Sequence, residues 1–273
     1  MRIPLTCIKC EYKFDILDGV SEIITADNPF IQYTLRSNHA LVGLSEIVPG
    51  QAKTVHLKDV FSEIHKIFLT PAGGQLIYCK PEKIGNSGFL IMSSKLEGRQ
   101  YPEEIQVSWI VYGNKRGVET PLWRQILSNA KGYEIDKDYR MEIVELETAF
   151  EVFLTEYLKL RLEQKCAGNV VETIFKHIRR MDDVTADIFK VTTGQKLRDM
   201  LRNGNRPKLY ANWKKYVKEQ RNRILHRGFK VDKAQAKKAF ETIFKIILFL
   251  EPKSLEYLYT SFEEHESIRS KRK

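Results

Sequence analysis

The strongest constraint on the fold is an apolar stripe that runs through residues 139 to 164. Its members alternate spacings of three and four residues: Ile143, Leu146, Phe150, Phe153, Tyr157 and Leu160. This spacing is typical of an amphipathic helix, because the side chains of a strand alternate at every second residue. A stripe of this length can be buried only against another long helix, so the sequence predicts a helical bundle.

Capping residues and apolar spacing predict the other helices. Asp232 and Gln235 form a capping box, the pattern that marks a helix start. Glycine or proline after an apolar face marks a helix end. The predicted helices cover about 122 to 130, 139 to 164, 170 to 178, 209 to 227 and 233 to 251. We expect the last four of these to form a four-helix bundle.

The first part of the chain has a different pattern. Short segments rich in β-branched and aromatic residues alternate with turn-formers, which is typical of strands. The predicted strands are 21–25, 31–35, 54–57, 67–69 with 75–79 as its hairpin partner, 89–92 and 105–112. The glycine-rich segment 113–117 ends this region. The sequence therefore predicts an α+β chain with a β-rich sandwich or barrel-like domain over 1–117, a helical domain over 118–262 and a basic tail over 263–273.

Composition limits the class of protein. The 273 residues are 42% hydrophobic and 29% charged, as in globular proteins. No apolar run approaches the length that crosses a bilayer, and the N-terminus lacks a signal-peptide pattern. We therefore expect a cytoplasmic protein that does not bind membranes.

Cysteine usage gives a weak indication of a metal site. Cys7 and Cys10 have the spacing of half a zinc ribbon, but the second close pair of ligands that such a site needs is missing from the sequence. Cys79 and Cys166 are isolated, and four cysteines do not make a disulfide framework. Reduced structural thiols are the preferred interpretation, and a zinc-dependent binding protein is an alternative. We predict no cofactor.

The candidate site is Arg221-Asn222-x-x-x-His226 at the end of the 209–227 helix, which Gly228 is expected to terminate. His226 then lies in the last turn, where the helix dipole favours a protonated imidazole. At about 100° per residue, Asn222 and His226 lie about 40° apart, whereas Arg221 and His226 are separated by about 140°. One helix therefore makes an incomplete site, and two such helix ends across a two-fold axis make a better one.

This Arg-Asn-x-x-x-His pattern, in a helical region from about Pro121 to Glu251, resembles the motif of the HEPN superfamily. The resemblance implies a metal-independent RNase in which Arg221 and His226 are the essential pair, Asn222 is a polar neighbour and dimerisation completes the site. It also implies a role as a toxin or antiviral effector. Gly228 stands where toxins controlled by nucleotidylation have a tyrosine, so control by that route is not expected.

Basic residues are concentrated around the motif. Between Arg206 and Lys238 the chain has twelve lysines and arginines, opposed only by Glu219 and Asp232. Such a density suits a polyanion and indicates RNA, although a solvated lysine face has the same composition. The predicted substrate-binding residues are Lys214, Lys218, Arg223, Arg227 and Lys230.

The glutamates of the 139–164 helix have two interpretations. They are Glu142, Glu145, Glu147, Glu151 and Glu156, and a solvated position is expected for all of them. The alternative is that Glu145 or Glu147 orients Arg221 across the bundle, since a buried arginine needs a partner.

Two functions from different classes follow from these residues. The first is a metal-independent endoribonuclease that uses the 2′-hydroxyl of RNA as nucleophile, with the β-rich domain binding a trigger, an inhibitory partner or the substrate. The second is a non-catalytic HEPN-like module that binds RNA or a nucleotide and dimerises.

Overall fold

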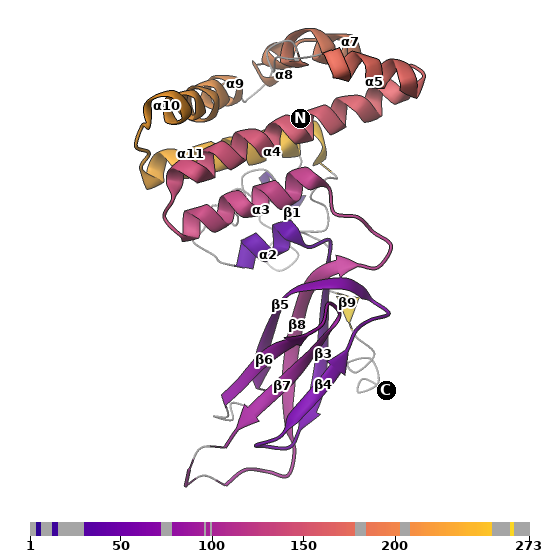
Figure 1. Cartoon of the computed structure of the whole chain (residues 1–273), viewed down its shortest axis with the longest axis vertical. Helices are drawn as coiled ribbons and strands as arrows, with labels where there is room; N and C mark the ends of the chain where they lie inside the picture. The colour runs from indigo at the N-terminus through magenta and orange to yellow at the C-terminus, as the bar shows by residue number, and fades with distance from the viewer. Residues whose placement is uncertain are drawn as a thin grey trace. The chain divides into compact units, whose positions relative to one another are not determined.

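The computed structural model describes residues 4–6, 13–15, 30–71, 78–95, 97–98, 100–177, 184–202, 208–252 and 263–264. Contacts divide the described residues into two compact units (Figure 1). The helical unit takes its residues from segments 1–32 and 122–255, and the β unit takes its residues from 33–121 and 256–273. The chain is α+β, as the sequence predicts.

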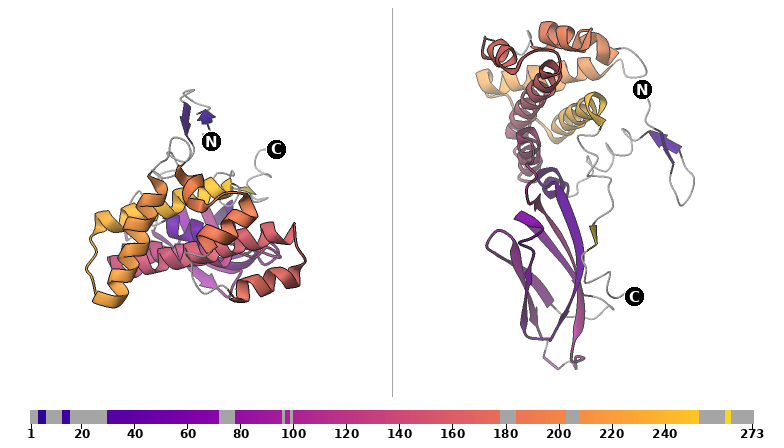
Figure 2. Two further views of the ribbon diagram at one scale, coloured as in Figure 1. Left: turned by 90° about the horizontal axis from the view of Figure 1, so that it is seen from above. Right: turned by 90° about the vertical axis from the view of Figure 1, so that its right-hand side faces the viewer.

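Two sheets make up the β unit. In the larger sheet, β8 (Ile105–Lys115) pairs antiparallel with both β5 (Phe61–Pro71) and β3 (His39–Ile47), and β9 (Glu263–Glu264) adds in parallel to β3. In the smaller sheet, β7 (Gly88–Ser94) pairs antiparallel with both β4 (Ala52–His56) and β6 (Tyr78–Ile84). The right-hand view of Figure 2 shows the two sheets as facing layers.

The two sheets share one core, which makes the β unit a sandwich. Alternate residues of β8 point inward, and the Trp109 ring meets the Phe89 ring of β7 edge to face with centroids 5.7 Å apart. Gly43 of β3 makes room for Trp109, because a Cβ atom at Gly43 would overlap the indole ring. The sandwich expectation is confirmed.

Residues 31–35, predicted as a strand, lie in a helix instead. Helix α2 (Phe30–Arg36) buries Ile31 and Leu35, which are four residues apart and so share one helical face. The Ser128 hydroxyl donates to the Gln32 carbonyl and ties this helix to the helical unit.

Strand β3 was not predicted from the sequence. The predicted strand 21–25 and residues 75–77 of the predicted hairpin lie outside the described residues, while a further pair, β1 (Pro4–Thr6) and β2 (Lys13–Asp15), is described.

The helical unit contains the predicted long helices with bounds close to those expected. The α-helices are α3 (Leu122–Ile135), α4 (Tyr139–Glu163), α5 (Gly168–His177), α7 (Phe189–Thr193), α8 (Leu197–Arg202), α9 (Leu209–Asn212), α10 (Glu219–Arg227) and α11 (Lys233–Leu250). Two π-helical segments are η2 (Val184–Ile188) and η3 (Trp213–Lys218). The predicted 209–227 helix is thus the continuous run α9–η3–α10, which we call the motif helix. None of the helices in the described segments is long and apolar enough to span a membrane.

The bundle differs from the predicted one in its fourth member. α3 runs along α4 (Figure 1), where the Trp123 ring packs on Phe153 at 5.2 Å, whereas α5 buries only Val171. Leu160 of the predicted stripe is 62% exposed, and Leu158 and Leu162 are buried instead. The physical reason is the drift of a 3.6-residue helix against a repeat of about 3.5 residues.

Two glutamates of α4 are buried, although a solvated position was expected. Glu142 is fully buried, and neither of its carboxylate oxygens has a hydrogen-bond partner among the described atoms. Burial raises its pKa to about 8, and the nearby Glu134 carboxylate adds to the rise while Lys131 opposes it. Lys131 pairs with Glu134 and lies 4.9 Å from the centre of the Phe240 ring of α11. A buried cluster of ionisable side chains therefore lies between α3 and α4 and packs against Phe240 of α11.

Candidate functional site

The candidate motif lies at the corner between the motif helix and α11. Gly228 adopts the left-handed conformation (φ 59°) and donates its N–H to the Ile224 carbonyl at 3.0 Å, which ends α10 as predicted. The predicted capping box starts α11, where the Asp232 carboxylate accepts from the Gln235 N–H at 2.8 Å. His226 is thus held in the last turn of a capped helix and is exposed.

A π-helical turn, which no sequence pattern indicated, precedes the motif. In η3 the buried residues Trp213 and Val217 follow each other at a spacing of four, and Gln220 is the next buried residue. Such turns are rare and interrupt the regular 3.6-residue phase of a helix. The Trp213 ring packs on Phe150 of α4 at 5.5 Å, so this turn anchors the motif helix to α4.

Arg221 faces the carboxylates of α4. Its side chain is half-buried, and its Nε atom is buried without a hydrogen-bond partner among the described atoms. Burial raises the pKa of Glu147 to about 7, while a hydrogen bond from Trp213 and the positive charges of Arg221 and Lys218 oppose the rise. Burial also raises the pKa of Glu151, and Arg221 again opposes the rise. Arg221 therefore lies within electrostatic range of two carboxylates.

Glu147 is the better placed of the two glutamates proposed as partners of Arg221. It is 2% exposed, and the Trp213 Nε1–H donates to its Oε2 atom at 3.0 Å. Sequence reasoning missed Trp213 and Glu151 as parts of this cluster. A usable signal was present in the spacing of Glu147 and Glu151, which lie four residues apart on one face of α4.

The three motif residues differ in their exposure within one chain. Arg221 is half-buried on the side that faces α4, whereas Asn222 and His226 are exposed. This agrees with the wide angle expected between Arg221 and His226 on one helix. Arg221 therefore does not share the exposed environment of Asn222 and His226.

The predicted substrate-binding residues surround the motif. Lys214, Arg223, Arg227 and Lys230 are exposed, while Lys218 is half-buried with its ammonium 5.7 Å from the centre of the Trp213 ring. Together they place positive charge along the motif helix and the loop that follows it.

Two apolar side chains are exposed beside His226. Leu225 is 55% exposed and Phe229 is 39% exposed, and the Arg223 guanidinium lies 5.6 Å from the centre of the Phe229 ring. Exposed apolar residues next to charged ones are common at protein interfaces.

The described residues contain no cluster of possible metal ligands. Across the described segments, no three His, Cys, Asp or Glu side chains are grouped so that they could hold a metal ion. Cys7 and Cys10 lie outside those segments, and Cys79 and Cys166 are free thiols.

Comparison with known proteins identifies no relative. No protein-family model matches the chain, and neither curated proteins nor solved structures give a significant match. The motif and its surroundings are therefore the basis for any functional assignment.

Proposed function

We propose that this protein is a metal-independent endoribonuclease that works as a homodimer. The observation that carries the proposal is the arrangement of the motif: His226 is exposed in the last turn of a capped basic helix, while Arg221 is half-buried within electrostatic range of the α4 carboxylates. The resemblance of Arg221, Asn222 and His226 to the HEPN motif supports the same assignment.

The chemistry needs only groups that RNA and this motif supply. The 2′-hydroxyl of RNA attacks the neighbouring phosphorus atom, and the bond from phosphorus to the 5′-oxygen breaks. His226 accepts the proton of the 2′-hydroxyl or donates a proton to the leaving oxygen, since imidazole serves both roles near neutral pH. Arg221 binds two phosphate oxygens with its planar fork, and Asn222 orients the imidazole. The products are a 2′,3′-cyclic phosphate and a 5′-hydroxyl.

A second copy of the chain completes the site in this proposal. Pairing two motif-helix ends buries Leu225 and Phe229, which one protomer leaves exposed, and it brings two His226 and two Arg221 side chains to one cleft. The cellular role that suits such an enzyme is that of a cytoplasmic toxin or antiviral effector, with a trigger or inhibitory partner binding the β unit.

RNA cleavage in excess EDTA tests the proposal. Purified protein is expected to cut RNA and leave cyclic phosphate ends, and His226→Ala is expected to lose this activity while keeping its circular dichroism spectrum. His177→Ala is the matched control, because His177 is also an exposed histidine in the last turn of a helix. Cleavage that chelation abolishes, or that survives in His226→Ala, contradicts the proposal.

The second candidate is a non-catalytic RNA- or nucleotide-binding dimer. The observation that favours it is that Arg221 is half-buried within electrostatic range of Glu147 and Glu151 of its own protomer. In that case RNA binding survives His226→Ala, and no cyclic phosphate ends form with the unchanged protein.

A further inference from the structure

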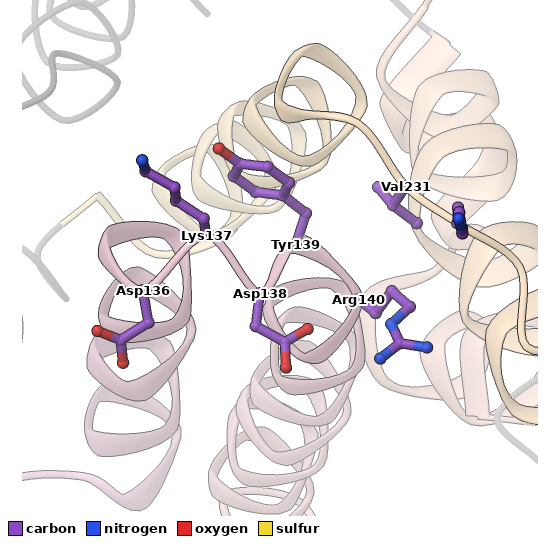
Figure 3. A pocket seen from close by; sticks show the side chains of 7 residues that line it. Asp136, Lys137, Asp138, Tyr139, Arg140 and Val231 are labelled. Atoms are coloured by element: carbon purple, nitrogen blue, oxygen red, sulfur yellow. The ribbon is translucent and has the colours of Figure 1, made fainter.

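A hollow next to the motif lies between two turns of the helical unit. It has a volume of about 410 Å³ and is lined by residues 136–140, where α3 turns into α4, and by Lys230 and Val231 of the loop before α11 (Figure 3). Cavities of roughly 300 to 1,000 Å³ accommodate small molecules. The motif and substrate-binding residues proposed above include only Lys230 of this lining.

The hollow is lined by three cations and two carboxylates, so positive charge outweighs negative charge around it. Lys137, Arg140 and Lys230 contribute three exposed cations. Of the two carboxylates in the lining, Asp138 already accepts from the Met141 N–H at 3.2 Å as the N-cap of α4. In Figure 3 the side chains of Asp136 and Asp138 project to one side of the turn, and those of Lys137 and Tyr139 project to the other.

The backbone presents Lys137 in a conformation that lysine rarely adopts. Its φ is 62°, and it is the only non-glycine residue with positive φ in the described part of the chain. The turn is tied on both sides, because the Lys137 N–H donates to the Glu134 carbonyl at 3.1 Å and the Asp138 N–H donates to the Tyr133 carbonyl at 2.9 Å. Glycine would adopt this conformation without strain, so the lysine at this position has an energetic cost.

The uncharged residues of the lining suit a nucleotide base. Tyr139 is half-buried and lines the hollow, and Val231 adds an apolar surface. An aromatic face with nearby cations is the combination that binds the base and phosphate of a single-stranded nucleotide. Lys230 follows His226 by four residues, so their Cα atoms lie within about 14 Å of each other. The hollow is therefore within reach of nucleotides that flank the bond proposed to be cut.

We infer that this hollow is a subsite for one nucleotide of the RNA strand beside the scissile phosphate, with its base against Tyr139 and its phosphate on Arg140, since these neighbouring residues both line it. The inference rests on the proposed function, because it names how the same site binds its substrate. The subsite contributes affinity and positions the strand, whereas the chemistry stays with Arg221 and His226.

Binding of a labelled single-stranded RNA to the full-length His226→Ala protein tests the inference without depending on cleavage. Adding Arg140→Ala is expected to weaken binding about tenfold and to reduce the slope of log affinity against log salt by about 0.7, the value for one phosphate contact. Adding Tyr139→Leu is expected to weaken binding with the slope unchanged. Lys176→Ala, which removes an exposed cation from α5, is the control and is expected to change neither.

Lys137→Gly tests whether weaker binding arises from a loss of stability. This variant relieves the left-handed strain, so its thermal stability is expected to be equal or higher while its RNA affinity falls. An unchanged salt slope in Arg140→Ala, or equal effects of Arg140→Ala and Lys176→Ala, overturns the inference.

Adenosine monophosphate is the probe that distinguishes binding of an RNA strand from binding of a free nucleotide. Binding of the mononucleotide as tight as that of the RNA, and lost in Arg140→Ala, means that the hollow serves a free effector and also overturns the inference. The two proposals can be refuted independently. If RNA binding depends on Arg140 but the unchanged protein does not cleave RNA, only the endoribonuclease proposal is refuted. If the unchanged protein cleaves RNA and Arg140→Ala changes neither its binding nor its cleavage, only the subsite is refuted.

Discussion

Replacing Glu142 with glutamine is expected to stabilise the helical unit at neutral pH and to remove part of its pH dependence. The carboxyl group has a pKa of about 8 in the folded chain against 4.5 in its reference state. Because the folded pKa is the higher one, the stabilising contribution is fully present below pH 4.5 and is lost as the pH rises to about 8. At pH 7 the unfolded chain has ionised this group while the folded chain still keeps it protonated. The cost to folding is then roughly 3 kcal/mol, at about 1.4 kcal/mol per pH unit.

Glutamine has nearly the same shape as glutamate and does not ionise, so Glu142→Gln avoids this cost. Urea unfolding followed by circular dichroism at 222 nm, which reports the helical unit, measures the effect at pH 4.5 and pH 7. The variant is expected to match the natural protein at pH 4.5 and to exceed its free energy of unfolding at pH 7 by up to about 3 kcal/mol. Glu163→Gln, at the exposed end of the same helix, is the control. Parallel pH profiles for Glu142→Gln and the natural protein refute the reasoning.

Three further substitutions test other contacts. Trp213→Phe removes the donor to the buried Glu147 carboxylate and is expected to cost about 1 to 3 kcal/mol of stability in urea unfolding at pH 8, with a smaller loss at pH 5, where the carboxyl is protonated. Gly43→Ala places a methyl group against the Trp109 ring and is expected to lower the melting temperature of the β unit, measured by near-ultraviolet circular dichroism, while the 222 nm signal of the helices stays. Gly228→Ala forces a left-handed conformation on alanine and is expected to cost about 1 kcal/mol, whereas asparagine at this position is expected to cost less.

Local signals were enough to predict helix α4, the end of α10 and the start of α11. The apolar spacing in 139–164 gave α4, and the Asp232–Gln235 capping box and Gly228 gave the start of α11 and the end of α10. These features depend on residues within one or two turns of each other, so a single sequence contains them. For the same reason, the position of His226 in the last turn was predictable before the fold was known.

The features that sequence reasoning missed depend on distant partners. Glutamate is usually solvated, and only the packing of α3 and α11 over α4 shows that Glu142 is buried. The same holds for Glu147, whose hydrogen-bond donor Trp213 comes from another helix. Helix α2 was misassigned because β-branched and aromatic residues favour strands locally, whereas burial of Ile31 and Leu35 on one face decides for a helix.

The position of Arg221 affects how mutations at the motif must be interpreted. Its positive charge opposes the rise in the pKa of the buried Glu147, and in the proposed reaction it also binds the scissile phosphate. Arg221→Ala therefore removes a structural counter-charge together with a substrate contact, and lost activity alone does not separate the two. Arg221→Lys keeps a positive charge near Glu147 but lacks the planar fork that binds two oxygens. Activity that falls in Arg221→Lys while stability stays assigns Arg221 to the phosphate, whereas activity that is retained assigns it to the fold.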